Sequence, residues 1–207
     1  MDNAAAFDET LKIVTTAQSV EDGMNALLDY SAAMYPSRIW AALKALDYQK
    51  DAIGIRTWLQ GILTTEPPSK YIKAFWFGIY NPVVDEVESR GLYMVGSTAP
   101  YSDDDPGWAC WQDDSYLSDN RYAPSSVLRD IYKAIALDDN LTPFGEYTLI
   151  LGYASLAVAE AIRGVSPSLF FGGGASDERR DVGIGFDDGD YLLLGRIAID
   201  RFERPTA

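Results

Sequence analysis

The stretch Val182–Gly195, "VGIGFDDGDYLLLG", decides the fold because it places two strand patterns on either side of a turn signal. Val182, Ile184 and Phe186 alternate with glycines, and a period of two is the pattern of a β-strand. The segment Tyr191–Ile199 is strand-like again. The DDGD between them is rich in the residue types that tolerate positive φ in tight turns. We therefore predict an antiparallel hairpin.

The loop of this hairpin sets its register. A two-residue type I′ loop at Asp188-Gly189 would pair Phe186 with Tyr191 and Ile184 with Leu193. One face would then carry the apolar side chains, and the glycines of the other face would leave room for a large neighbour such as an apolar helix. The three aspartates of the turn also admit a weak calcium site, but they lack the alternating ligands and the downstream Glu of an EF-hand loop. We predict a solvent-exposed turn and no metal site.

Helical patterns fill the first 65 residues. The segment "SVED", Ser19–Asp22, offers a side-chain oxygen that can accept a backbone N–H, with a carboxylate three residues later. Apolar residues then recur at helical spacing as far as Leu63, with a break at Pro36, because proline disfavours helix in the residue before it. We predict three or four helices here, joined to the remainder by the short Pro-rich segment "TTEPPSK".

Strand patterns begin after this connector. Ile72–Tyr80 and Gly91–Ser97 are rich in aromatic and β-branched residues and are predicted strands with a hairpin-like connection between them. A short strand is also expected at Trp108–Trp111. Ser125 is placed to cap a helix over the residues that follow it. Tyr147–Ile162 is apolar almost all round and rich in small residues, which is typical of a helix packed on several sides.

These patterns predict one α+β domain over residues 1–207. Its helical part covers residues 1–65. Its sheet-containing part, residues 70–200, is expected to hold an antiparallel sheet of four or five strands with two helices packed on it. The hydrophobic content of 47% is enough for a sizeable core and argues against disorder.

The charge balance restricts the possible partners. The chain has 31 acidic and 17 basic residues and a formal net charge of −14. A protein binds nucleic acid or an anionic membrane surface through clusters of Lys and Arg, so we expect neither as a partner of this acidic chain. A basic protein is favoured, since complementary charge speeds encounter and penalises wrong partners. The sequence leaves the oligomeric state open.

The absence of histidine excludes whole classes of chemistry. No histidine is present, so serine–histidine triads, His-paired cysteine nucleophiles and zincin motifs cannot be built. The single cysteine, Cys110, allows neither an intrachain disulfide nor a Cys-rich metal site. We expect no cofactor and favour a protein that is not an enzyme. One reduced thiol, no recognisable signal peptide and no apolar run of about 20 residues also point to the cytoplasm.

The region Tyr101–Asp114, "YSDDDPGWACWQDD", is the strongest candidate site. Nine acidic residues and one Arg lie between Asn81 and Asn120, with aromatic residues interspersed. Aromatic anchors within a charged rim are a common interface composition, although tryptophans in such a loop could instead fill the core. The candidate partner-binding residues are Tyr101, Asp103, Asp104, Asp105, Trp108, Trp111, Asp113, Asp114 and Tyr116.

The segments "WFGIYNP", "LYMVGS", "WACW", "EYTLILGYASLAVAEA" and "VGIGFDDGDYLLLG" together resemble a group of bacterial proteins of unassigned function, over roughly Trp76–Gly195. In size, acidity and lack of catalytic motifs the chain is also similar in type to the immunity proteins that accompany secreted bacterial toxins. This resemblance assigns no catalytic or binding residue.

Our leading hypothesis is therefore a cytoplasmic acidic binding protein of the immunity type, which would neutralise a bacterial toxin by covering its basic surface. The alternative is a histidine-independent hydrolase that uses carboxylates or a divalent metal. A scaffold or self-associating protein is a third possibility. A cleft lined by converging acids would favour the hydrolase, and an acidic surface without such a cleft would favour the binding protein.

Overall fold

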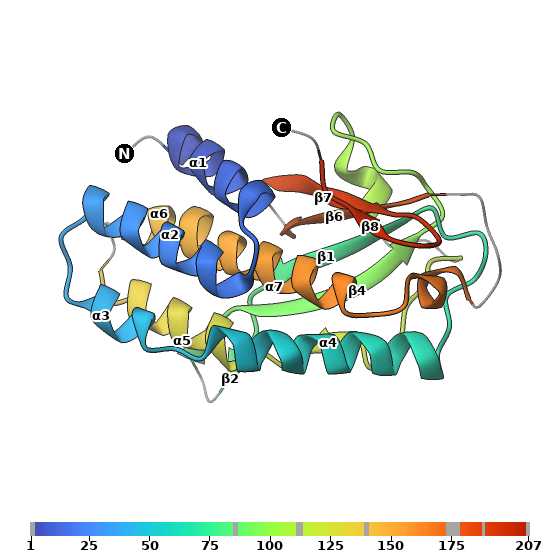
Figure 1. Cartoon of the computed structure of the whole chain (residues 1–207), viewed down its shortest axis with the longest axis horizontal. Coiled ribbons are helices and arrows are strands. Elements are labelled where there is room, and N and C mark those ends of the chain that lie inside the picture. Colours follow the sequence, from blue (N-terminus) through green and yellow to red (C-terminus); the bar gives the residue numbers. More distant parts are fainter. Residues whose placement is uncertain are drawn as a thin grey trace.

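A computed structural model describes residues 3–84, 87–110, 114–138, 141–172, 179–187 and 189–205 of the chain (Figure 1). The predicted helical start is confirmed. Four helices form it: α1 (Asn3–Thr16), α2 (Val20–Met34), α3 (Ile39–Lys44) and α4 (Tyr48–Thr65). The Ser19 side chain caps α2 by accepting a hydrogen bond from the Asp22 backbone N–H at 3.1 Å, as the sequence predicted.

Six strands of the described residues form one open mixed sheet in the order β5-β4-β1-β6-β7-β8. The strands predicted near 72–80 and 91–97 are confirmed. The bounds are β1 (Ala74–Tyr80), β4 (Gly91–Ser97), β5 (Tyr122–Ala123), β6 (Arg180–Phe186), β7 (Tyr191–Ile197) and β8 (Phe202–Glu203).

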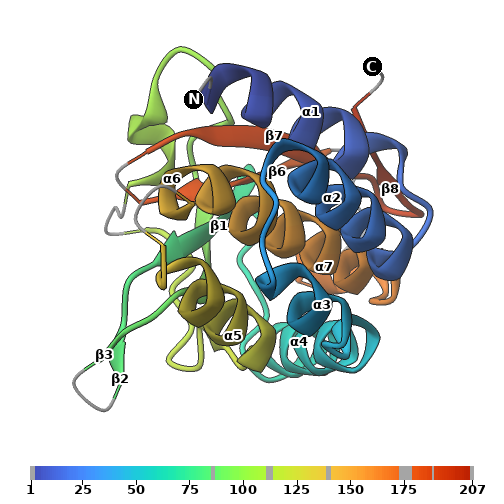
Figure 2. The ribbon, with the colours of Figure 1, turned by 90° about the vertical axis from the view of Figure 1, so that its left-hand side faces the viewer.

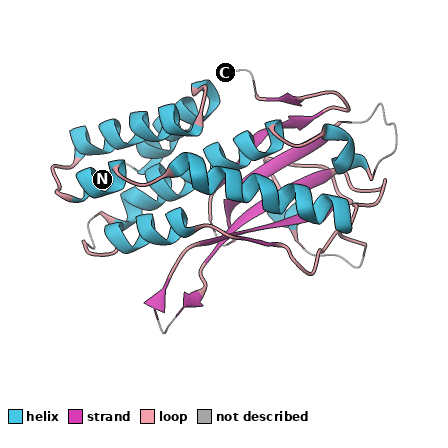
Figure 3. Ribbon diagram, turned by 60° about the horizontal axis from the view of Figure 1, so that its bottom comes forward, coloured by secondary structure: helices cyan, strands magenta, loops and turns pink. Residues whose placement is uncertain are grey.

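The prediction of a purely antiparallel sheet with four or five strands is wrong in two details. The sheet has six strands, and its central pair, β1 and β6, runs parallel. Parallel neighbours need a long crossover, and the chain supplies one between β1 and β6 that contains several helices. The expected hairpin-like connection after β1 is a small two-stranded ribbon, β2 (Val83–Val84) with β3 (Val87–Glu88), which projects from the body (Figures 2 and 3).

The hairpin β6–β7 forms, but the pairs predicted next to its turn are wrong by one residue, as far as a register shift between Val182 and Gly183 beyond which Val182 pairs with Gly195. Ile184 pairs with Leu192. The Phe186 backbone N–H donates to the Asp190 carbonyl at 3.1 Å, so the loop holds three residues and not the predicted two at Asp188-Gly189. Asp188 itself lies outside the described residues. A slip of one residue exchanges the two faces of a strand.

This slip changes what packs on the hairpin. Most branched side chains of β6 and β7 lie on the face that the helices cover, and Gly183 of β6 lies on the other face, against Trp108. The predicted apolar helix therefore packs on side chains, and the glycines receive a different neighbour. The residues on the helix side are Val182, Ile184, Leu192 and Leu194.

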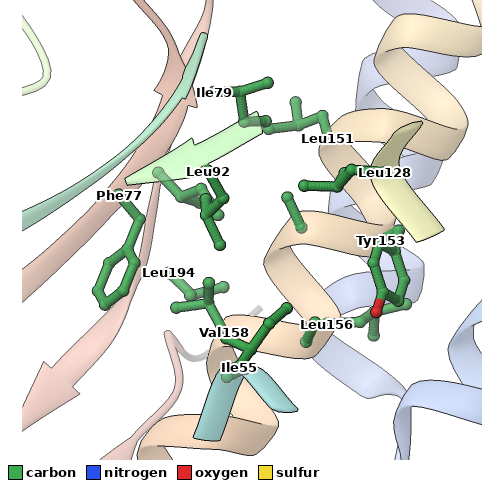
Figure 4. Close-up of a cluster of buried hydrophobic side chains, with 14 of the residues drawn as sticks. Ile55, Phe77, Ile79, Leu92, Leu128, Leu151, Tyr153, Leu156, Val158 and Leu194 are labelled. Carbon is green, nitrogen blue, oxygen red and sulfur yellow. The ribbon is translucent and has the colours of Figure 1, made fainter. Parts of the chain in front are cut away.

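The predicted central helix is confirmed as the middle of the core. A helical run passes from α6 (Thr142–Gly145) through a π-helical turn (Glu146–Ile150) into α7 (Leu151–Arg163), which lies against β1, β6 and β7. Helix α5 (Ser126–Ile135) begins at the predicted Ser125 cap. Figure 4 shows side chains from both layers meeting: Phe77 and Ile79 of β1, Leu92 of β4, Leu194 of β7, Leu151 and Val158 of α7, Leu128 of α5 and Ile55 of α4.

One hydrophobic core therefore joins the helical start of the chain to the sheet. Domain organisation as a single unit remains the prediction made from the sequence. No helix among the described residues combines the length and apolar character that crossing a membrane requires.

The Asp51 side chain connects α4 to the start of α5 through hydrogen bonds. Its carboxylate accepts hydrogen bonds from the Ser125 hydroxyl at 2.7 Å, from the Ser126 backbone N–H at 2.9 Å and from the Tyr153 hydroxyl at 2.6 Å. A carboxylate at a helix N-terminus also complements the helix dipole. Burial, followed by the nearby Asp51 charge, raises the pKa of Tyr153, so this hydroxyl keeps its proton.

Candidate binding site on the second face of the sheet

The sheet face that points away from α7 carries a second, smaller hydrophobic cluster. Its buried members are Ala74 and Trp76 of β1, Val95 of β4, and Trp108, which comes from the loop after β4. Residues of a strand alternate between faces, so the same strands that supply the main core also supply this cluster. Tyr93, Tyr101 and Tyr191 pack around it. In Figure 2 the loop that follows β4 arches over the outer side of the sheet.

Gly183 of β6 lies directly beneath the Trp108 ring. A Cβ atom at Gly183 would lie 2.7 Å from Cζ2 and 2.8 Å from Cη2 of the Trp108 ring, closer than real Cβ contacts come. The Tyr93 ring similarly lies over Gly78 of β1. Aromatic rings can approach this face closely because the backbone beneath them has no side chain. The large neighbour of the hairpin glycines is thus a loop tryptophan.

Specific polar contacts hold the loop on the sheet. The Ser97 hydroxyl donates to the Trp108 carbonyl at 2.5 Å, and the Tyr191 hydroxyl donates to the Ser102 carbonyl at 2.9 Å. The Asp105 carboxylate accepts from the Gly107 backbone N–H at 2.9 Å and so caps a short 3-10 helix, Pro106–Ala109. This helix replaces the strand predicted near Trp108, because the Pro after an Asp cap favours a helical start.

A pocket of about 500 Å³ opens between this loop and the end of the β6–β7 hairpin. That volume is in the range typical of ligand sites. Its described wall is largely aromatic, with one carboxylate and no basic residue. The lining residues are Trp76, Tyr93, Pro106, Gly107, Trp108, Ala109, Cys110, Phe186, Asp187, Gly189 and Tyr191. We call it the aromatic pocket.

A directed chain of hydrogen bonds runs along one wall of the aromatic pocket. The Trp76 indole N–H donates to the Tyr93 hydroxyl at 3.2 Å, and the Tyr93 hydroxyl donates to Asp187 Oδ1 at 2.6 Å. Burial is the main cause that raises the pKa of Tyr93, and the hydrogen bond to Asp187 adds to it. Tyr93 therefore remains protonated at neutral pH and keeps its hydrogen bond to the carboxylate.

Further carboxylates lie close to Tyr191, one of the residues that line the aromatic pocket. Asp103, Asp104 and Asp105 are exposed, and they raise the pKa of Tyr191 after the larger effect of burial, which places their charges close to the start of β7. Exposed Asp190, immediately before Tyr191, accepts from the Tyr147 hydroxyl at 2.7 Å. That hydrogen bond is the main cause that raises the pKa of Tyr147 to about 12. Asp103, Asp104, Asp105 and Asp190 thus form an acidic rim beside Tyr191, at one edge of the aromatic pocket.

The structure places the sequence-predicted site residues unevenly. Tyr101 is half-buried and donates to the Asp103 carboxylate at 2.7 Å, and the exposed Asp103–Asp105 stretch lies beside it. Trp108 is 4% exposed, so it forms a wall of the protein and does not project as the interface anchor that was expected. Large rings that can reach an apolar cluster are buried there.

The remaining predicted residues lie elsewhere or outside the described ranges. Asp114 is exposed and accepts from the Thr98 hydroxyl at 3.2 Å. Tyr116 packs edge-on against Phe75 of the main core, and is therefore separate from the aromatic pocket. Trp111 and Asp113 fall outside the described residues.

Sequence reasoning missed the two most informative residues of the pocket wall, Tyr93 and Asp187. Tyr93 had been treated as part of a strand, and Asp187 as part of a turn. The available signal was the period of two: Trp76 and Gly78 share one face of β1, and Tyr93 is opposite Gly78 in the register. Without the pairing of β1 with β4 and β6, that signal could not be assigned to a site.

Within the described ranges, no group of three Asp, Glu, Cys or His side chains is placed to hold a metal ion. One of the three turn aspartates considered for calcium, Asp188, lies outside those ranges. Comparison of the chain with protein-family models, curated proteins and solved structures gave no match. The proposed function therefore rests on the chemistry of the site.

Proposed function

We propose that this protein is an acidic binding protein that uses the outer face of its sheet to hold a basic protein. In its most specific form the proposal is an immunity protein, which neutralises a toxin by covering a basic surface. The net charge of −14 and the absence of histidine support binding over catalysis. The resemblance in type to small acidic immunity proteins agrees with this proposal.

The observation that carries the proposal is the placement of charge beside an aromatic surface. Asp103, Asp104 and Asp105 are exposed on the loop that covers the second face, and none of them pairs with a basic side chain in the part of the chain that the structure describes. Elsewhere several surface carboxylates do have Lys or Arg partners, such as Asp29 with Lys44. Three neighbouring carboxylates at one site repel one another, and a basic partner relieves that repulsion.

The hydrolase alternative receives less support from the same geometry. Glycoside hydrolysis and related chemistry use two carboxylates that converge on the scissile bond. The described wall of the aromatic pocket contributes one, Asp187, whose Oδ1 already accepts a hydrogen bond from the Tyr93 hydroxyl. The other rim carboxylates belong to exposed residues. This arrangement fits recognition of a positive surface better than acid–base work on a bound substrate.

The proposal is tested with two variants of equal net charge. In the face variant, Asp103, Asp104 and Asp105 are changed to Asn, which keeps a side-chain oxygen for the Tyr101 and Gly107 hydrogen bonds. In the control variant, three exposed acids outside the pocket lining are neutralised: Glu21→Gln, Asp29→Asn and Asp200→Asn.

Wild-type protein and both variants are immobilised and exposed to lysate and secreted proteins of the host and related strains. We expect one basic protein to be retained by the wild type and the control variant, and to be lost from the face variant. Purified, it should bind more weakly as salt is added. Equal retention by both variants would show that this face is not the binding surface, and failure of the wild type to retain any basic protein would refute the proposed function.

A further inference from the structure

We infer that the aromatic pocket receives one arginine side chain of the basic partner. This inference rests on the proposed function and makes it specific: the carboxylates of the rim would steer the partner, and the pocket would hold a single guanidinium.

The aromatic rings of the wall meet at steep angles. The Trp76 and Trp108 rings are 5.9 Å apart between centroids at an interplanar angle of 84°, and the Trp76 and Tyr191 rings are 6.0 Å apart at 76°. Trp76 is 5% exposed and Trp108 4%, so the ring area open to a flat cation belongs mainly to the partly exposed Tyr93, Phe186 and Tyr191. The face of an aromatic ring attracts cations, more strongly when the site is shielded from water.

The protons of Trp76, Tyr93 and Tyr191 in this wall are already engaged, whereas the buried Trp108 indole N–H has no hydrogen-bond partner among the described residues. An indole N–H can only donate and a carboxylate can only accept, so the order Trp76 to Tyr93 to Asp187 is fixed in direction. The Tyr191 hydroxyl likewise donates to the Ser102 carbonyl. What this part of the wall offers an occupant is ring faces and carboxylate lone pairs. Guanidinium matches it, because it is planar, has five donors and has no acceptor.

The negative charge of the pocket and of the chain makes other occupants less favourable than arginine. A lysine ammonium would also be attracted, but it is strongly hydrated and cannot stack as a flat group on Trp or Tyr. A second copy of this chain is disfavoured, because two chains of net charge −14 repel one another. A neutral sugar could stack on the rings, but it would gain nothing from the carboxylates of the rim.

Cys110 provides a direct probe, because it is the single cysteine of the chain, is exposed and lines the aromatic pocket. Its reaction rate is measured with two methanethiosulfonate reagents of similar size, one carrying a trimethylammonium group and the other a sulfonate. The ratio of the two rates cancels the reactivity of the thiol itself and reports the local charge. We expect the cationic reagent to react roughly tenfold or more faster, with the ratio falling as salt is added.

Occupancy is then tested by protection of Cys110 from a neutral thiol reagent. N-acetyl-arginine amide should slow labelling of the wild type, and Asp187→Asn should weaken that protection by about tenfold, since a charge-assisted hydrogen bond is lost. Glu21→Gln removes the same charge from α2 and should leave protection unchanged. Lysine amide should protect less well, and a neutral disaccharide should not protect.

Three outcomes would overturn the inference: no protection by N-acetyl-arginine amide, equal protection of wild type and Asp187→Asn, or better protection by the disaccharide. A change in fold is excluded by requiring that Asp187→Asn keeps the wild-type unfolding temperature and near-ultraviolet circular dichroism. These outcomes are separate from the proposed function. If a basic protein still depends on Asp103–Asp105 while the pocket ignores arginine, the binding function stands and the pocket assignment fails.

Discussion

Replacing Gly183 with Ala should destabilise the protein by moving Trp108 off the sheet. The added Cβ would lie 2.7 Å from Cζ2 of Trp108 and 3.3 Å from the Tyr101 ring, so a rigid indole would have to shift. Trp108 is 4% exposed and its carbonyl is held by Ser97, so there is little room for it to move outward. This is overpacking of a filled cluster.

The expected size of the effect follows from such substitutions in other cores. Overpacking costs about 1–3 kcal/mol of unfolding free energy. For a chain of this length, each kcal/mol corresponds to about 2–4 °C in Tm, so a decrease of about 2–12 °C is expected. Gly61→Ala is the matched control. Gly61 is exposed inside α4, and a Cβ there would meet nothing within 4 Å. The Gly61→Ala variant should be more stable than the wild type by about 0.5–1 kcal/mol, because Ala has a higher helix propensity than Gly.

The assay is urea unfolding followed by tryptophan fluorescence, together with the near-ultraviolet circular dichroism of the folded variants. Gly183→Ala should shift the midpoint down and change the aromatic dichroism, whereas Gly61→Ala should shift the midpoint up and leave the dichroism unchanged. If Gly183→Ala is as stable as wild type with an unaltered aromatic spectrum, Trp108 does not sit on this glycine and the described second cluster is incorrect.

Two further predictions concern the Asp51 junction. Asp51→Asn should lower the unfolding free energy by about 1–3 kcal/mol in urea titration, because the buried Tyr153 hydroxyl loses a charged acceptor. Asp29→Asn, which breaks one exposed ion pair, should cost about 0–1 kcal/mol, and equal effects would contradict the role of Asp51. Because the folded-state pKa of buried Tyr153 is raised, its contribution to stability is present below pH 10 and is lost as pH rises above 10, with a slope of about 1.4 kcal/mol per pH unit. Unfolding measured between pH 9 and 11 should show this slope reduced in Tyr153→Phe, and an identical slope in the variant would refute the assignment.

Local patterns were sufficient to predict much of the fold. Ser19 and Ser125 cap the helices that the sequence assigned to them, since capping depends on a few neighbouring residues. The alternation in β6 and the aromatic and β-branched content of β1 and β4 likewise indicated strands, because such residues suit the buried faces of a sheet.

The pairing of strands that are distant in the sequence could not be predicted from local patterns. The parallel contact between β1 and β6 joins segments about 100 residues apart, and no local signal specifies it. The pairing next to the β6–β7 turn depended on a loop of three residues instead of two, and this difference places Val182 and Ile184 toward the helices and Gly183 toward Trp108.

The candidate site shows the same division between local and long-range information. Acidic residues 103–105 could be found from composition because exposed charge is a local property. Tyr93 and Asp187 could not, because they meet only after β1, β4 and β6 have paired. Trp108 was found, but its burial depended on Gly183, which lies 75 positions further along the chain.

The most direct test of the central claim is the association rate of the captured basic protein, measured by stopped flow across a series of salt concentrations. The account predicts that the wild type and the Glu21, Asp29 and Asp200 control variant associate rapidly and slow together as salt rises. The Asp103–Asp105 face variant should associate about tenfold more slowly at low salt and show a shallower salt dependence. Rates that are the same for the face variant and the control variant at every salt concentration would contradict the claim that this acidic face receives the partner.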